Sequence, residues 1–242
     1  MRMMLIAFLA LSVAPVGAQD MMRNVDLSSP DMISAEMTRA DVEAALAAAA
    51  GRQKTADFTG KRLSGLDLSG LDLSGAVLRA DELRLVEPRG AKLQGANLFA
   101  TQMQRAKLDG ADLSGARVVA DMTGASLTGA SLANARMGAD MKNQSMGLMR
   151  AVLTSAKLDG ANLRGADLAR AGIEFASLKG ADLTDASLAG ADLGGADLRG
   201  AFVAGADFSG TDLTSTRLVG TIGLHAAKNL DKAQNLERAI RN

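Results

Sequence analysis

The chain has 242 residues, with 27 basic and 27 acidic side chains and a single histidine, so its formal net charge is zero. It contains no cysteine, tyrosine or tryptophan. This composition excludes disulfide bonds, cysteine-based zinc sites and a strong global field that would attract nucleic acid. Because the chain has only six phenylalanines against 26 glycines, we expect its core to be narrow.

The first eighteen residues have the pattern of a secretory signal peptide. Arg2 precedes an apolar run from Met3 to Val13, and residues 16–18 form a small-residue cleavage site. The run is too short to span a bilayer, and no later stretch is apolar enough to do so. We therefore expect a mature chain that starts near Gln19, has no transmembrane segment and is periplasmic or secreted. The alternative is a buried N-terminal helix.

A short helix is predicted ahead of the repeats, within a segment that we assign to residues 19–55. Thr38 is followed three residues later by Asp41, which is a typical helix start, and the alanine-rich run that follows ends at Gly51. Residues 19–33 are polar and have no clear periodicity. We expect the helix to cap the structure that follows it.

From residue 56 to residue 222 the sequence repeats every five residues. The stretch ADLGGADLRG at 191–200 shows the unit, in which a small and a polar residue precede a leucine that we call the centre. An α-helix would spread these leucines around every face, and a straight strand would turn alternate ones outward. A chain that turns a corner every five residues points all of them inward, and four sides close one coil. We expect buried centres, outward-facing neighbours, and stacking on the equivalent centre about 20 residues earlier.

Units such as ADLSG, ANLRG, ADLTD and ADLGG resemble the pentapeptide-repeat family, whose motif is written A(D/N)LXX. The resemblance covers about three quarters of the chain, from Ala56 to Gly220. It implies an all-β solenoid, specifically a right-handed quadrilateral β-helix, and the handedness comes from the family alone. The number of units gives about eight coils, and we expect short helical caps at both ends.

The period is interrupted in two places. Pro88 occupies a centre, so the side around it is expected to be distorted or to form a short bulge. After Val118, two steps of four residues and one of seven cancel, which predicts that the coils stay in register. The centres in this second interruption are Met122, Leu127, Leu132, Met137, Met141, Met146 and Leu153.

Methionines are frequent in the second interruption, and thioethers suit copper(I) in exported proteins. Because Met122, Met137, Met141 and Met146 fall on centres, we interpret them as residues that fill an irregular core. Copper binding, with Met149 leaving the repeat frame to pair with Met146, is the alternative.

Residues 223–242 follow the repeats and carry one apolar stripe at helical spacing. This stripe predicts a helical C-terminal cap that lies on the last coil or meets a second copy, so the chain is expected to be a monomer or a homodimer through this cap. A cap is needed because a naked coil exposes strand edges and an open core. The stripe consists of Leu224, Ala227, Leu230, Ala233, Leu236 and Ile240.

Candidate catalytic residues are sparse. His225 is the only histidine, so hydrolytic triads and ordinary zinc sites are incomplete. The aspartates stand at one repeated outward position, which makes each a poor candidate for a tuned acid. Glycine–aspartate calcium repeats have a different period, about nine residues, and phosphate-loop and dinucleotide fingerprints are absent. We predict no catalytic, cofactor or metal site.

The predicted register places many basic residues on one of the four sides, with a net charge of about +4, and makes two other sides acidic. Phe99 and Val119 are expected to add a small apolar spot to the basic side. The alternative is a set of solvated ladders in which Lys157, Asp159 and Lys179 offset one another. The candidate partner-binding face consists of Arg79, Phe99, Arg117, Val119, Arg136, Lys157, Lys179, Arg199 and Arg217.

These expectations describe a non-enzymatic exported scaffold of the cell envelope that binds a protein or an anionic envelope component. The resemblance offers another role, because some members of the family protect DNA gyrase by mimicking duplex DNA. That role requires a strongly acidic surface and a cytoplasmic location, whereas this chain is neutral and carries an export pattern. We therefore expect no nucleic-acid partner and no cofactor.

Overall fold

Each regular corner of the fold is a tight turn that starts at a centre. The small residue of the next unit donates its N–H to the carbonyl oxygen of the preceding centre, as Ala161 does to Leu158 at 3.0 Å. The residue two after the centre has a positive φ, which is +65° at Gly160. A turn with this hydrogen bond and a positive φ at its third residue is a type II turn, and glycine adopts it without strain.

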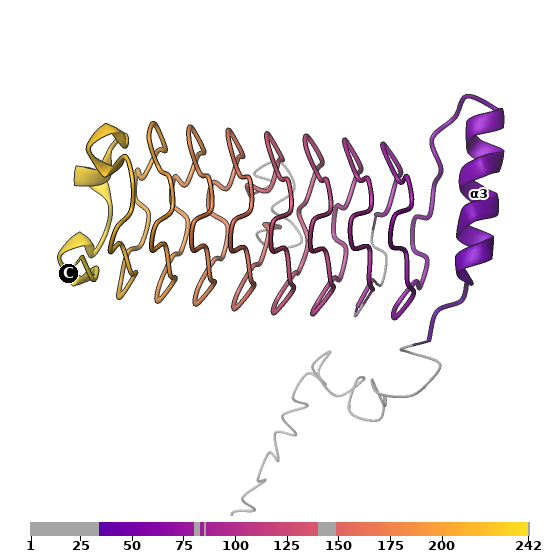
Figure 1. Ribbon diagram of the computed structural model, residues 1–242, viewed down its shortest axis with the longest axis horizontal. Helices are drawn as coiled ribbons and strands as arrows, with labels where there is room; N and C mark the ends of the chain where they lie inside the picture. Colours follow the sequence, from indigo (N-terminus) through magenta and orange to yellow (C-terminus); the bar gives the residue numbers. More distant parts are fainter. Residues whose placement is uncertain (1–33, 80–82, 85, 140–148, 242) are drawn as a thin grey trace, which may run out of the picture. The chain divides into compact units, whose positions relative to one another are not determined.

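The computed structural model describes residues 34–79, 83–84, 86–139 and 149–241. Ile33–Asn242 forms one unit, a β-helical solenoid in which the strands are reduced to single parallel bridges. The helix α3 (Arg39–Gly51) lies at one end of the stack, and three 3-10 helices lie at the other end (Figure 1). The predicted signal peptide and residues 19–33 lie outside the described residues. Within them, no helix has the length and apolarity that crossing a membrane requires.

Parallel β-bridges join each coil to the next and fall in four rows, which we call sides 1 to 4 in chain order. Side 1 starts at Asp57, side 3 at Asp67 and side 4 at Asp72, while side 2 runs through Gln102. The bridging residue is the one before the centre. Asn162 on side 4 is typical, since its N–H and its carbonyl both bond to the previous coil, at 2.9 and 2.7 Å. Every regular side is therefore a one-residue ladder.

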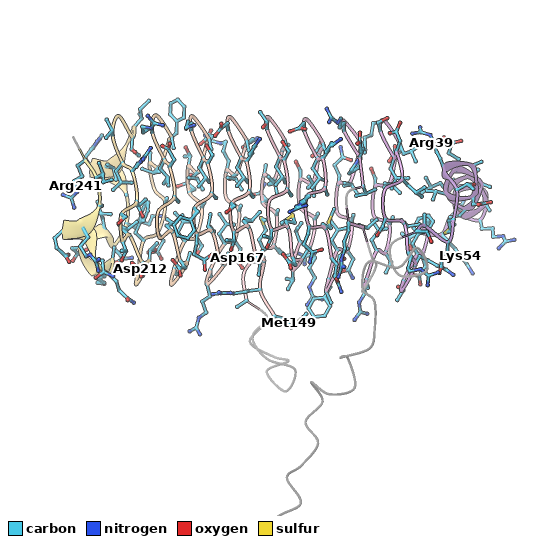
Figure 2. The ribbon with its side chains drawn as sticks, turned by 90° about the horizontal axis from the view of Figure 1, so that it is seen from below. Arg39, Lys54, Met149, Asp167, Asp212 and Arg241 are labelled. Atoms are coloured by element: carbon cyan, nitrogen blue, oxygen red, sulfur yellow. The ribbon has the colours of Figure 1, made fainter. Side chains whose placement is uncertain are left out.

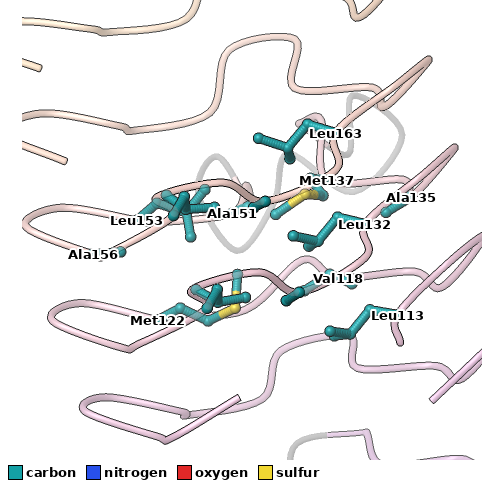
Figure 3. Packing of buried hydrophobic residues seen from close by; sticks show 14 of the residues in the cluster. Leu113, Val118, Met122, Leu132, Ala135, Met137, Ala151, Leu153, Ala156 and Leu163 are labelled. Atoms are coloured by element: carbon teal, nitrogen blue, oxygen red, sulfur yellow. The ribbon is translucent and has the colours of Figure 1, made fainter. Parts of the chain in front are cut away.

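The centres form a continuous core through the stack (Figure 3). The described leucine, isoleucine, valine, methionine and phenylalanine centres from Phe58 to Leu218 are each at most 3% exposed. Met122 and Met137 are fully buried among them, so their interpretation as core residues is confirmed. The other two methionines of the predicted set, at 141 and 146, lie outside the described residues.

Pro88 is buried at a centre, and residues 86–90 keep the regular bridge-and-turn pattern, while residues 80–82 and 85 of the predicted irregular stretch lie outside the described residues. Its carbonyl oxygen closes the usual turn with the N–H of Ala91 at 3.0 Å. Proline has no N–H, so this centre cannot make the ladder bond that other centres make. The neighbouring ladder bond from Lys107 N to Val86 O remains, at 2.9 Å.

The register predicted across the second interruption is wrong. The spacing argument stacked Leu158 on Met137, but the residue before Met137, Arg136, forms its bridge with Asp167. Met137 is therefore followed on side 1 by Leu168. Every centre after the interruption is displaced by two sides from its predicted place.

The hydrogen bonds at the interruption explain this displacement. The carbonyl oxygen of Met137 accepts from the N–H of Ala151 at 3.1 Å, the bond that closes a corner elsewhere. Val152 then bridges Asp121 on side 2, so Leu153 is the next centre after Met137. The sequence spacing predicted two further sides between Met137 and Leu153, whereas the observed hydrogen bonds join these two centres by a single corner.

The helix expected before the repeats is α3. Thr38 is its N-cap, with Oγ1 accepting from the N–H of Asp41 at 3.2 Å, while the Asp41 carboxylate accepts from the N–H of Thr38 at 2.8 Å. Val42 is buried in the core cluster. Arg39 donates to the carbonyl oxygen of Asp67 in the first coil at 3.0 Å. The helix therefore covers the N-terminal end of the solenoid core.

The C-terminal segment is not the single helix that its apolar spacing predicted. It contains three 3-10 helices, η2 (Leu224–Ala226), η3 (Leu230–Lys232) and η4 (Leu236–Arg238). Between and after them, Lys228, Gln234 and Ile240 each bridge the preceding coil, and Lys228 N bonds to Ala206 O at 2.8 Å. One continuous α-helix would use these N–H groups internally and leave the last coil unpaired. The apolar residues of the predicted stripe pack, partly buried, against the core, except Ile240, which is 43% exposed.

Candidate partner-binding surface

The outward aspartates brace the corners of the coils. Asp57 accepts hydrogen bonds from the N–H of Thr59 at 2.9 Å and from its hydroxyl group at 2.6 Å. These bonds stabilise the turn, and the hydroxyl bond is the largest cause that holds the pKa of Asp57 below its ordinary value. Asp207 is bonded in the same way by Ser209, at 3.0 and 2.6 Å. Such carboxylates stay ionised and serve the fold, so the surface must be judged from the remaining side chains.

The nine residues of the predicted partner-binding face do not lie on one side. The corrected register separates them into two groups on opposite sides of the solenoid, so the single basic face is wrong. The net charges predicted for the other sides are also wrong, because they were assigned with the same register. Side 1 carries Arg79, Phe99, Arg117, Val119 and Arg136, and side 3 carries Lys157, Lys179, Arg199 and Arg217.

The side 1 group forms an arginine–aromatic stack. The guanidinium group of Arg117 lies 4.1 Å from the centroid of the Phe99 ring, and that of Arg79 lies 5.6 Å from it. A guanidinium over an aromatic face is attracted by the ring quadrupole, so Phe99 orients both cations. Arg136 is exposed in the following coil. We call Arg79, Phe99, Arg117 and Arg136 the side-1 basic patch.

Among the described residues, the outward positions of side 1 that flank the centres of this patch carry no acidic side chain. The described acidic residues on this side that come next are Asp57 before the patch and Asp167 after it. The patch therefore holds three cations within four consecutive coils, and adjacent coils are spaced like neighbouring strands, about 4.8 Å apart. Side chains project outward along the length of the stack (Figure 2).

Val119 does not contribute the apolar spot that was expected of it. Only 4% of the residue is exposed, and it lines a cavity of about 220 Å³ with Met149 and Arg150. The step from Val118 to Met122 is one residue short, and no residue between them has a positive φ. The usual projecting turn is missing at this corner, so Val119 stays against the stack.

The side 3 group is interleaved with acidic residues. Asp197 is 14% exposed at its side chain and pairs with Arg199 at 2.7 Å, while Lys179 and Arg217 lie 3.9 and 4.0 Å from it. The hydrogen bond from Arg199 is the largest cause that lowers the pKa of Asp197. Asp159 accepts from the N–H of Lys179 at 3.1 Å. This arrangement matches the alternative interpretation, in which neighbouring charges offset one another.

Other polar features of the described residues do not converge. His225 is exposed on η2, and no group of three or more histidine, aspartate or glutamate side chains is placed to hold a metal ion in the described part of the chain. A cavity of about 400 Å³ lies beside the end of α3 and is lined mainly by alanines, with Lys54, Asp72 and two hydroxyl residues at its edge. These features give no set of groups aimed at one reacting atom.

Comparison with known proteins identifies a family and solved structures that are similar to this chain. The profile of a family described as pentapeptide repeats matches residues 89–117, 148–185 and 186–222, with eight copies. No curated protein sequence matches the chain. Sequence reasoning missed the contact between Phe99 and the two arginines, although the twenty-residue spacing of Arg79 and Phe99 was a usable signal.

Two solved structures illustrate the similarity. HetL, a pentapeptide repeat protein involved in heterocyst differentiation regulation from the cyanobacterium Nostoc sp. strain PCC 7120, is 32% identical, with 76% of this chain and 82% of HetL covered and a TM-score of 0.36. A trypsin-treated form of QnrB1, a plasmid-mediated fluoroquinolone resistance protein, is 19% identical, with 74% of this chain and 87% of QnrB1 covered and a TM-score of 0.50.

Proposed function

Because the chain belongs to the pentapeptide-repeat family, we propose that it is a non-enzymatic scaffold that binds an anionic partner of the cell envelope through its side-1 basic patch. An acidic protein surface is the first candidate, and an anionic envelope polymer is the second. The observation that carries the proposal is the stack of Arg79 and Arg117 on Phe99, with Arg136 in the next coil. Binding must use such outward residues, because the inward ones fill the core.

The proposal includes export of the chain. The apolar run 3–13 and the small residues 16–18 support a signal peptide, and the mature scaffold would then be periplasmic or secreted. Mass spectrometry of the envelope fraction is expected to find a chain that begins at Gln19 or within a residue or two of it. A full-length chain confined to the cytoplasm would contradict export.

The proposal also includes details of the architecture. We take the winding to be right-handed and the number of coils to be about eight, in agreement with the resemblance to the family. A monomer, or a homodimer through the C-terminal cap, stays a prediction. Ile240, which is 43% exposed in the cap, supports association at that end.

Two alternatives have less support. Protection of a topoisomerase by mimicry of DNA requires an acidic surface, whereas this chain is neutral and exposes a basic patch. The likeness to QnrB1 is a likeness of fold at 19% identity. Copper binding by methionines is opposed by the full burial of Met122 and Met137 in the core.

The test is retention of the purified protein on envelope material. A variant with Arg79→Glu, Arg117→Glu and Arg136→Glu is expected to lose salt-sensitive retention, because it replaces three cations of the patch by anions. The matched control, Lys92→Glu, Arg105→Glu and Arg164→Glu, makes the same change of charge away from side 1. If the side 1 variant is retained as strongly as the unmodified protein, the patch is not the binding site.

A further inference from the structure

Basic and acidic side chains on side 3 follow a regular order, and the proposed binding through side 1 does not involve them. We call the two outward residues that flank a centre a rung. Among rungs whose two residues are both described, opposite charges on one rung occur on side 3 and on no other side. The four rungs concerned are Glu87/Arg89, Lys107/Asp109, Lys157/Asp159 and Asp197/Arg199.

We propose that side 3 is an interface for a second copy of this chain, packed face to face with both stacks pointing in the same direction. A two-fold axis parallel to the stack brings each rung opposite the same rung of the other copy, with the order of its residues reversed. The residue before each centre then meets the residue after the same centre in the other copy. Glu87 meets the other Arg89, and Lys107 meets the other Asp109.

The charge pattern therefore complements itself at all four rungs, with two ion pairs across the interface at each rung. Both copies have the same spacing between coils, so the pairs stay in step along the whole side. The middle rung, Ser126/Thr128, is small and uncharged, which allows close approach. The remaining rungs carry at most one charge each: Asp67/Ser69, Ser177/Lys179 and Arg217/Val219.

The opposite relative direction is disfavoured by the same residues when the two sides overlap around Ser126. An antiparallel pair centred on Ser126 would place rung 107/109 against rung 157/159, with the order of residues kept. Lys107 would then face Lys157, and Asp109 would face Asp159, so the ends of this contact would repel. In this register the order of charges therefore favours the parallel arrangement over the antiparallel one.

Most of the charged side chains of side 3 are available for such contacts, whereas that of Asp197 is only 14% exposed. The side-chain exposures of Glu87, Arg89, Lys107 and Arg199 are 37%, 50%, 43% and 47%. Some of these residues pair along their own coil or with the next one, as Arg89 does with Glu87 at 3.7 Å. Exposed pairs of this kind are individually weak and readily shared with a second partner. The interface is therefore expected to be wet, moderate in affinity and sensitive to salt.

The test uses two variants that make the rungs uniform in charge. One variant, Lys107→Glu with Lys157→Glu, has two all-acidic rungs, and the other, Asp109→Lys with Asp159→Lys, has two all-basic rungs. Sedimentation equilibrium at low salt is expected to show a dimer for the unmodified protein, with a dissociation constant at least about tenfold higher for either variant alone. A mixture of the two variants is expected to form a one-to-one heterodimer, because each acidic rung then meets a basic one.

The controls separate this proposal from the others. Arg79→Glu with Arg136→Glu makes the same change of charge as the acidic variant on side 1, and it is expected to leave the dimer unchanged. Formation of the heterodimer would itself show that both variants are folded. A monomeric unmodified protein, variants that dimerise normally, or a dimer lost only on Leu230→Glu in the C-terminal cap would each overturn the proposal. None of these outcomes bears on retention by side 1, which has its own test.

Discussion

Each residue of the five-residue unit makes a contact that its neighbours cannot make. In the unit at 181–185, Leu183 fills the core, and Asp182 accepts from the N–H of Thr184 at 2.9 Å. Ala181 is fully buried, and its N–H closes the preceding corner by bonding to the carbonyl oxygen of Leu178 at 3.1 Å. A larger residue at the alanine would crowd a core that is already filled. Three consecutive residues of the motif therefore have separate roles: the alanine closes the turn, the aspartate stabilises the next turn, and the leucine fills the core.

The first prediction contrasts two adjacent residues of this unit. Leu183→Ala is expected to cost about 2–5 kcal/mol of unfolding free energy, and Leu183→Asp more, because it places an unpaired carboxylate in a dry core. Asp182→Ser is expected to cost about 1 kcal/mol or less, because serine can brace the same turn. Urea unfolding followed by circular dichroism measures all three. Equal losses at the two positions would contradict the inward and outward assignment.

At the scale of the elements, the two caps differ in how far the sequence predicted them. The start of α3 could be predicted because the capping box at Thr38 and Asp41 is a local signal. The apolar stripe predicted the wrong kind of C-terminal cap, because leucines six residues apart are rotated by about 240° on an α-helix and do not share a face, whereas they fit a ladder with six-residue sides. The better signal was the left-handed residue before each leucine, which is Gly223, Asn229 or Asn235.

The second prediction concerns this cap. Asn235 has a φ of +57°, and its amide group donates to the carboxylate of Asp212 at 3.0 Å. Asn235→Ala is expected to lose this bond, about 1 kcal/mol, and to add about 1–2 kcal/mol of left-handed strain. Asn235→Gly keeps the permitted φ and loses only the bond, so it separates the two costs. Urea unfolding should rank the unmodified protein above the glycine variant and the glycine variant above the alanine variant. The reverse order of the two variants would contradict the described cap.

At the scale of the whole solenoid, side-chain period predicted the architecture and the burial of the centres, but it did not predict the sides correctly. Up to Met137 the predicted side of each centre agrees with the observed side, because each centre follows the previous one by a corner of known length. Beyond it, the backbone bond from Ala151 to Met137 decides which side comes next. A count of residues does not reveal this bond, so it assigned the centres after Met137 to the wrong sides. The partner-binding face was predicted from that count, so its nine residues lie on two opposite sides instead of one.

The third prediction concerns the stability of the whole solenoid at acid pH. Aspartates on all four sides have lowered pKa values, with Asp212 as the example on side 2. The largest cause is a hydrogen bond from a hydroxyl two residues on at Asp57, Asp67, Asp72 and Asp207. A carboxyl group whose pKa is lower in the folded state binds fewer protons there than in the unfolded chain. Its contribution is present above the unfolded pKa, about 3.9 for aspartate, and is lost as the pH falls through the folded value.

We therefore expect the melting temperature to be nearly constant above about pH 5 and to fall steadily below about pH 4. The control replaces Asp57, Asp67, Asp72 and Asp207 by asparagine, which already braces a corner at Asn162 by accepting from the N–H of Arg164 at 3.1 Å. This variant keeps the turn acceptor without a titrating group, so its fall in melting temperature below pH 4 should be shallower than that of the unmodified protein. Calorimetry across this pH range measures both curves. If the two proteins lose stability with the same slope, the outward aspartates do not couple protonation to unfolding, and the acid sensitivity of the solenoid must arise elsewhere.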